Sequence, residues 1–392
     1  MTLENCEETF LKNNLALLAQ QYNVSLSDAD IAQAKIWDLP YASIESNIYN
    51  PQNKKVFDVT NSKSVQIQQL LLLGGKRKSE IEFLKSNKEL SQLQFQQLLA
   101  DLKAQLRENF YSLYFEQKKV ENIEVQLKYL NELLNAYKVQ TNKGNTSLRD
   151  QVRLQSMVMA LNSDKISANN NILGFEQNLK LLTGISEEIL PDLSEAEVKD
   201  LLAFQPLQNA DEIQKKAFEN NADYLSSLKM IDNNKLYMNW QKSLNVPDLT
   251  VGGVYNQGGG TFKNEVDFTV GIPIPLWKRN AGNIQKAQVQ IDQSTKYAEL
   301  KKLTLQIQIS QAYQTWQNQY NMLNSVQQKD VENLETVYKG VLDNFHKGNV
   351  TLIEFTDFMD SYRQSVSQIY EMKKQVLISA EEINHLTQTK IF

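Results

Sequence analysis

The distribution of proline constrains the fold of this chain more than any other feature of its 392 residues. All seven prolines lie outside two long tracts, 52–190 and 276–392. A proline inside a helix removes a backbone hydrogen bond and costs about 3 kcal/mol, so both tracts are free to form continuous helix. Gln, Asn, Lys, Leu and Glu fill them, which is the composition of long helices that face water.

Each tract contains one short turn sequence, and about 68 residues without a helix breaker precede it, 75–142 and 279–346. Such a stretch is about 100 Å long as a helix. A glycine suits the left-handed end of one helix, and Thr or Ser suits the N-cap of the next. We therefore predict two long antiparallel helical hairpins. The turns are Lys143, Gly144, Asn145, Thr146 and Ser147, and Lys347, Gly348, Asn349, Val350 and Thr351.

A coiled-coil seam supports the first hairpin, because apolar side chains recur at alternating steps of three and four residues. The seam consists of Val120, Ile123, Leu127, Leu130, Leu134 and Tyr137.

From Val266 to Leu276 every second residue is apolar. This period of two predicts a strand with one apolar and one polar face, which leads directly into a long helix. A second predicted strand, Val65–Leu73, likewise leads into a long helix, which starts near residue 76. Each of these strands follows another predicted strand, at 41–49 or 249–255, and so completes a β-hairpin. The expected strand-to-helix junction residues are Gly74, Gly75, Pro273, Pro275, Trp277 and Gly282.

The chain therefore has two copies of one plan, with a period of about 205 residues. The first repeat, 1–205, contains a helix (3–38), a β-hairpin (41–73), a helical hairpin (75–183) and a lateral segment (184–205). The second repeat, 206–392, contains a helix, a β-hairpin (248–276) and a helical hairpin (278–392). The predicted fold class is mainly α with a small β part.

Composition excludes several classes of protein. The net charge of −5 gives no support for nucleic-acid binding, and the single cysteine, Cys6, excludes an intrachain disulfide. No apolar run approaches the ~18 residues of a membrane-spanning helix. The polar start is not a secretory signal, so either the protein stays inside the cell or this is a mature form with an added Met1. We expect no lipidation, metal site, cofactor or enzymatic activity.

Four strands cannot close a barrel, and their exposed edges favour sharing one barrel among identical subunits. Three copies would contribute twelve strands. Strands of about ten residues with one apolar face fit a tilted crossing of a bilayer. The helices are too polar for lipid, so they would continue the barrel in water as a tube.

These features resemble the outer-membrane efflux proteins of the TolC type, and the resemblance covers essentially the whole chain. It rests on residues 3–14, on the two Lys-Gly-Asn turns, and on the stretch 272–283, Ile-Pro-Ile-Pro-Leu-Trp-Lys-Arg-Asn-Ala-Gly-Asn. It implies a homotrimer whose β-barrel in outer-membrane lipid continues into a coiled-coil α-barrel in the periplasm. The implied partners are a periplasmic adaptor (membrane fusion) protein and an inner-membrane transporter. The sequence is most similar to the branch that serves heavy-metal pumps of the resistance-nodulation-division class.

Glu354, Asp357 and Asp360 are spaced three apart and would share one helical face. In a trimer they would form stacked acidic rings that select cations, although acids also suit the first turn of a helix. The resemblance implies that Glu354 and Asp357 line the closed entrance.

The resemblance also implies a lock near the second turn, formed by a tyrosine and an arginine. Phe345 and Val350 stand at those positions here, so Arg149 and Asp150 are considered for a different pairing.

The two turns, 143–147 and 347–351, are the docking points for the adaptor that the resemblance implies. Gly-Asn also makes a tight turn without any partner. An alternative function is a cytosolic coiled-coil scaffold or tether in which the predicted strands are loops. The exported substrate, small molecules or metal ions, stays open.

Overall fold

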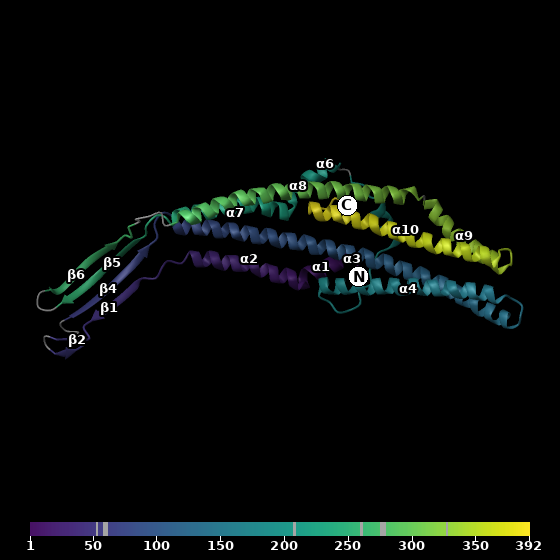
Figure 1. Cartoon of the computed structure of the whole chain (residues 1–392), viewed down its shortest axis with the longest axis horizontal. Coiled ribbons are helices and arrows are strands. Elements are labelled where there is room, and N and C mark those ends of the chain that lie inside the picture. Colours follow the sequence, from purple (N-terminus) through teal and green to yellow (C-terminus); the bar gives the residue numbers. More distant parts are fainter. Residues whose placement is uncertain (52–53, 58–61, 207–208, 259–261, 275–279, 327) are drawn as a thin grey trace. The chain divides into compact units, whose positions relative to one another are not determined.

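The computed structural model describes residues 1–392 apart from 52–53, 58–61, 207–208, 259–261, 275–279 and 327. It is mainly α-helical with a small antiparallel sheet, as predicted. The chain divides into two compact units (Figure 1). We call Met1–Ala19, Gln96–Ala222 and Lys302–Phe392 the turn unit, and Gln20–Phe95 and Asp223–Lys301 the strand unit. Each unit contains segments from both halves of the sequence.

The strand unit contains a four-stranded antiparallel sheet in the order β1-β4-β5-β6 (Figure 1). The strands are β1 (Tyr41–Ser46), β4 (Ser62–Leu71), β5 (Leu249–Gly258) and β6 (Phe262–Gly271). A short separate pair, β2 (Tyr49–Asn50) and β3 (Lys55–Val56), lies between β1 and β4 in the chain. The two predicted hairpins are confirmed, and pairing of β4 with β5 joins them into one sheet.

The register of the sheet gathers the apolar side chains on one face. Val65 lies opposite both Ile44 and Tyr255, and Tyr255 lies opposite Val266. The large apolar side chains of this face are exposed: Ile44 by 77%, Ile67 by 58%, Val266 by 76%, Phe268 by 77% and Val270 by 55%. The other face carries polar rows, such as Glu45, Ser64, Asn256 and Glu265. The predicted two-faced strand is confirmed.

The predicted ends of the strands need correction. β6 ends at Gly271, five residues before the predicted end, and residues 272–274 have no regular structure. Pro273 explains this early end, because proline has no N–H to donate to a strand ladder. Pro275 and Trp277 lie outside the described residues, and Gly282 lies in the first turn of α8 (Ala281–Ser325). β1 is also shorter than predicted, and β4 begins three residues earlier.

In the turn unit, the first helical hairpin has the predicted form. It consists of α3 (Lys76–Asn142), whose end lies in this unit, and α4 (Leu148–Thr183). The second hairpin consists of α9 (Gln328–His346) and α10 (Leu352–Thr387). Four of the predicted seam residues, Ile123, Leu127, Leu130 and Leu134, are buried and pack with side chains of α4, α9 and α10 in one hydrophobic core.

The predicted continuous helix 279–346 is wrong, because α8 ends at Ser325 and α9 begins at Gln328. The Ser325 hydroxyl donates to the Met322 carbonyl at 2.7 Å, and the Val326 N–H donates to the Leu323 carbonyl, three residues back. Both bonds use carbonyls that would otherwise accept helical bonds four residues on. α9 turns away from the line of α8 there (Figure 1).

The predicted helix 3–38 is also interrupted, and consists of α1 (Leu3–Asn13) and α2 (Leu15–Ala34). Asn14 at the break is buried, donates to the Leu182 carbonyl at 2.9 Å and accepts from the Leu17 N–H. The same arrangement occurs between α6 (Ala210–Asn220) and α7 (Ala222–Ser243), where Asn221 donates to the Leu386 carbonyl at 3.0 Å. These asparagines tie each break to the end of a long hairpin helix.

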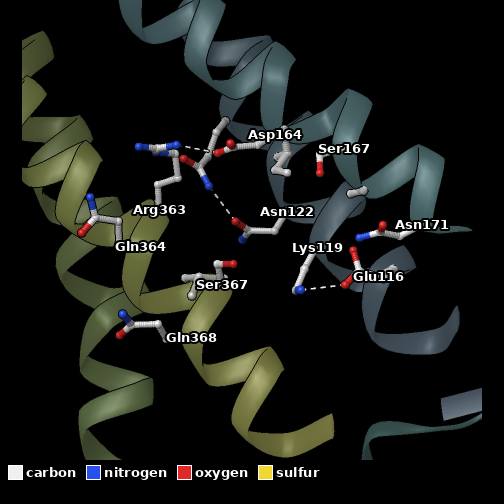
Figure 2. Close-up of a pocket in the computed structure, with 14 residues that line it drawn as sticks. Glu116, Lys119, Asn122, Asp164, Ser167, Asn171, Arg363, Gln364, Ser367 and Gln368 are labelled. Carbon is white, nitrogen blue, oxygen red and sulfur yellow. Dashed lines mark hydrogen bonds and ion pairs between the residues drawn. The ribbon is translucent and has the colours of Figure 1, made fainter. Parts of the chain in front are cut away.

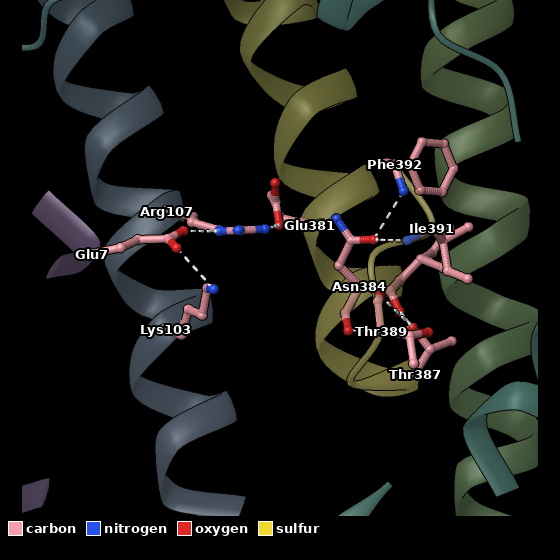
Figure 3. A network of polar contacts seen from close by, with 10 residues as sticks. Glu7, Lys103, Arg107, Glu381, Asn384, Thr387, Thr389, Ile391 and Phe392 are labelled. Atoms are coloured by element: carbon pink, nitrogen blue, oxygen red, sulfur yellow. Dashed lines mark hydrogen bonds and ion pairs between the residues drawn. The ribbon is translucent and has the colours of Figure 1, made fainter. Parts of the chain in front are cut away.

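A polar network fastens α1 and α10 to α3 (Figure 3). The Arg107 guanidinium donates to Glu7 at 2.6 Å and to Glu381 at 2.7 Å, and Lys103 pairs with Glu7 at 2.8 Å. Burial raises the pKa of Glu7, but the bonds from Arg107 and Lys103 outweigh it and hold that pKa below its usual value. Asn384 accepts from the Ile391 and Phe392 N–H groups and so holds the C-terminal residues against α10.

The lateral segment contains one helix, α5 (Glu195–Ala203), which begins with a capping box between Ser194 and Glu197. Among the described helices, none is both long enough and apolar enough to cross a bilayer.

Candidate functional site

The two turns of the turn unit have the same backbone structure. Gly144 and Gly348 have φ of +77° and +76°. The N–H of each glycine donates to the carbonyl three residues back, and the N–H of the following asparagine donates to the carbonyl five residues back, at 2.9 Å in both turns. This pattern is the Schellman motif, in which a left-handed glycine ends a helix. The Lys-Gly-Asn sequence therefore has a definite structural role at both turns.

The helices that follow the turns begin with different caps. Ser147 accepts from the Asp150 N–H at the start of α4. Thr351 accepts from the Glu354 N–H, and the Glu354 carboxylate accepts in return from the Thr351 N–H and hydroxyl, both at 2.8 Å. These two bonds lower the pKa of Glu354. Glu354 is thus held ionised at the start of α10 and also caps it.

Glu354, Asp357 and Asp360 lie on one exposed face of α10, as their spacing predicts. The opposite face carries Phe355, Met359 and Tyr362, which are at most 5% exposed. The core therefore fixes which way the three carboxylates point, away from the packed hairpins.

The three acids differ in their partners. Asp360 lies 3.8 Å from Arg363, whose guanidinium also pairs with Asp164 of α4 at 2.5 Å. Within the described chain no ion pair reaches the Asp357 carboxylate, and Glu354 bonds only in its capping box. Glu354 and Asp357 consequently carry the least compensated negative charge of the set.

The candidate pairing of Arg149 and Asp150 stays within one turn of α4. The two side chains lie 3.7 Å apart, and Arg149 is 83% exposed. A polar contact between α4 and α10 near the turns comes instead from Arg153, which donates to the Thr356 hydroxyl at 3.5 Å. Arg153, Asp164 and Arg363 were not singled out from the sequence, because a pairing between helices 200 residues apart leaves no local signal.

Phe345 and Val350, which stand where the resemblance implies a polar lock, contribute to the hydrophobic core. Phe345 stacks on Phe355 with ring centroids 4.4 Å apart, and Tyr129 packs against both Phe355 and His346. The second turn is therefore held by aromatic packing at the position of that lock.

A polar cavity of about 440 Å³ lies among α3, α4 and α10 (Figure 2). The Arg363–Asp164 pair lies at one side, and Glu116, paired with Lys119 at 2.7 Å, lies at the other. Gln126 lines the cavity and is 2% exposed, and its side-chain oxygen has no hydrogen-bond partner within the described residues. Arg363 thus connects this cavity to the acidic face of α10.

No group of three or more His, Cys, Asp or Glu side chains is placed to hold a metal ion in the part of the chain that the structure describes.

The profile of the outer membrane efflux protein family matches residues 8–185 and 215–387, most of the chain. The chain belongs to this family. The efflux protein is 23% identical over 294 residues to the cobalt-zinc-cadmium resistance protein CzcC of Cupriavidus metallidurans, covering 75% of this chain and 68% of that one. Its fold is similar to the solved structure of CusC, with a TM-score of 0.78, 14% identity and coverage of 98% and 92%. It is also similar to the CmeC outer membrane channel of Campylobacter jejuni, with a TM-score of 0.76, 13% identity and coverage of 99% and 86%.

The efflux protein is therefore an outer-membrane channel of an efflux system, with a periplasmic extension. This assignment disfavours the alternative of a cytosolic scaffold. The family is one of transport channels.

Proposed function

We propose that three copies of the efflux protein form one passive conduit, in which a twelve-stranded barrel in the outer membrane continues into a periplasmic tube of helices. The observation that carries the proposal is the four-stranded sheet, whose outer strands β1 and β6 are each paired on one side only within the described chain. Open edges and an exposed apolar face are liabilities for a lone subunit. Pairing β6 of one copy with β1 of the next removes the edges.

The mass of the detergent-purified particle tests this assembly. We expect three 45.0-kDa chains per particle. A monodisperse single chain that is stable without amphiphile would contradict the proposal.

The entrance of the conduit is formed by Glu354 and Asp357, with Asp360 in a lesser role. Two observations support this: the acidic face of α10 is exposed, and no ion pair neutralises the first two carboxylates within the described chain, whereas Asp360 lies near Arg363. Rings of carboxylates favour cations in a pore. Arg149 and Asp150, on the other turn, pair with each other, so we assign them no net charge at the entrance.

Single-channel recording in planar bilayers tests the entrance. We expect the double variant Glu354→Gln/Asp357→Asn to lose most of its preference for cations. Gln at position 354 retains an oxygen for the capping box, so the helix start is preserved. The variant Asp360→Asn is the matched control, and we expect a smaller effect because Arg363 already compensates that charge. If the double variant kept the cation selectivity of the parent protein, the carboxylates of α10 would not form the entrance.

The turns 143–147 and 347–351 are the docking points of a periplasmic adaptor, which links the channel to an inner-membrane transporter. The proposal is supported by the shared backbone structure of the two turns, with Lys143 and Lys347 exposed beside the structural glycines. A photo-crosslinking residue at Lys143 or Lys347 leaves the Schellman bonds intact. We expect it to capture the adaptor, while the same residue at Lys296 of α8 does not. Equal capture at all three positions, or none at the turns, would exclude this docking site.

The cargo is proposed to be divalent heavy-metal cations, with small organic molecules as the second candidate. The name of the relative CzcC and the acidic face of α10 support the first. Expression in cells that lack their own channel, with a matching pump and adaptor, should restore growth in zinc or cobalt. Restored growth only in organic toxicants would favour the second candidate.

The halves 1–205 and 206–392 are proposed to be structural repeats of one ancestral unit. The Asn14 and Asn221 breaks, the two Schellman turns and the two matched segments of the family profile support this.

A further inference from the structure

We propose that the segment before β1, together with the start of α3, binds the anionic headgroups of phospholipids at the periplasmic surface of the outer membrane. We call Lys35, Ile36, Trp37, Leu39, Arg77 and Lys78 the collar. The proposal rests on the proposed lipid contact of the sheet's apolar face, and it adds a headgroup site below that face. All collar residues belong to the strand unit.

The side of the sheet on which the collar lies is decided by one hydrogen bond. The Gln69 amide donates to the Asp38 carbonyl at 2.8 Å. Gln69 lies in register with Val251, which lies opposite Val270, so its side chain belongs to the apolar face. The backbone at Asp38, next to Trp37, therefore lies on the lipid-facing side, at the end of β4.

The apolar collar side chains are too exposed for a surface in water. Ile36 is 59% exposed, Trp37 64% and Leu39 84%. Three large apolar side chains within four residues, at the end of a lipid-facing sheet, continue its contact with lipid. Tryptophan in particular favours the boundary between headgroups and acyl chains.

The charged collar side chains fit phosphate groups at that boundary. The Arg77 guanidinium lies over the Trp37 ring, 4.1 Å from its centroid, and 3.9 Å from the Asp38 carboxylate. Lys78 is 81% exposed and lies 3.9 Å from Glu82, and Lys35 is also exposed. Asp38 and Glu82 thus lie beside two of the three collar cations, and three positive against two negative charges leave a net charge of +1.

The neighbouring Lys76 shows the contrast. It is buried and pairs with Asp248 at 2.6 Å, in a bond that closes the junction of strand and helix. Its charge is compensated inside the protein, so the basic residues at the start of α3 that remain to attract anionic lipid are Arg77 and Lys78, with Lys35 before β1. Basic side chains at a membrane surface have this preference.

Tryptophan fluorescence locates the collar. The assembled protein, carrying Trp37 as its single tryptophan with Trp240, Trp277 and Trp316 replaced by Phe, is placed in bilayers whose lipids carry bromine near the top of the acyl chains. We expect strong quenching of Trp37. A protein with Trp316 alone, in the buried aromatic cluster of the turn unit, is the negative control.

A third protein tests the proposed barrel separately from the proposed collar. It carries Phe268→Trp as its single tryptophan, on the exposed apolar face of β6. Quenching at position 268 but not at Trp37 would overturn the collar and leave the barrel intact. Absence of quenching at both positions would overturn both.

The headgroup preference has its own test. Native mass spectrometry measures retention of phosphatidylglycerol against phosphatidylcholine. We expect Lys35→Gln/Lys78→Gln to weaken phosphatidylglycerol retention by roughly fivefold for each charge removed. Lys339→Gln, at an exposed position of α9, should leave retention unchanged. Equal retention in the collar variant and the control would overturn the preference for anionic lipid.

Discussion

At the scale of single residues, the two turn glycines are required by backbone conformation and by nothing else. A side chain at Gly144 or Gly348 would meet no atom within 4 Å, yet both residues have φ near +77°. L-residues adopt that conformation only with strain. The requirement for glycine therefore comes from the end of the helix and not from the packing around it.

We expect Gly144→Ala or Gly348→Ala to lower the free energy of unfolding by about 1 kcal/mol. The matched control is Gly340→Ala inside α9, which also has open space around its Cβ but lacks a positive φ. It should be stabilising by about 0.5–1 kcal/mol. Denaturant unfolding followed by circular dichroism measures all three, and a loss of equal size at Gly340 would refute this explanation.

His385 is the residue whose charge state couples most directly to helix packing. The carboxylates of Glu382, 3.6 Å from Nδ1, and Asp101, 2.7 Å from Nε2, raise the pKa of His385 above about 6.5, although burial opposes the rise. A histidine whose pKa is higher in the folded than in the unfolded protein stabilises the fold when it is protonated. This stabilisation is fully present at a pH below the pKa of the unfolded state, and it is lost as the pH rises through the pKa of the folded state.

His385→Gln should therefore be less stable than the parent protein at pH 6, and the difference should shrink toward alkaline pH. Thermal unfolding at a series of pH values measures it. A difference that is independent of pH would mean that the charge has no part in holding α10 to α3.

At the scale of helices, the two asparagine breaks determine where the N-terminal helix of each half ends. Asn14 is 4% exposed and satisfies one carbonyl of α4 and one N–H of α2. Removing such a side chain leaves both groups buried without partners.

We expect Asn14→Ala to cost about 2 kcal/mol of stability. Asn14→Asp keeps the acceptor for Leu17 but loses the donor to Leu182, so it should also destabilise. Asn220→Ala, at an exposed neighbour of Asn221, is the control and should have little effect. Chemical denaturation compares the parent protein with the three variants. Equal stability of Asn14→Ala and Asn220→Ala would mean that the hydrogen bonds of Asn14 do not stabilise the break.

At the scale of the whole molecule, the two faces of the sheet separate lipid from water. Phe268→Arg places a charge on the exposed apolar face, and it should destabilise the membrane-inserted state by about 2–4 kcal/mol if the position lies near the bilayer midplane. Thr269→Arg, one residue further on the polar face, should be tolerated.

The fraction of protein that enters liposomes, separated by flotation, distinguishes these variants. If both variants inserted equally well, the apolar face of the sheet would not be the face that contacts lipid.

The sequence alone determined the features that depend on local periodicity and on turn chemistry. Two-residue alternation predicted the faces of β4 and β6, seam spacing predicted the buried side of α3, and Lys-Gly-Asn predicted both Schellman turns. Each of these follows from how one residue type fits one backbone conformation, so no distant contact was needed.

Only the tertiary structure decided the breaks at Asn14 and near Ser325, the pairing of β4 with β5, and the contacts of Arg363 with Asp164. The sequence around Asn14 reads as continuous helix, because the bond that stabilises its break goes to Leu182, 168 residues away. Likewise, the spacing of the α10 acids shows that they share a face, but only the aromatic core behind them determines which way that face points. Interactions between distant segments have no local pattern, and they decided what local propensity left open.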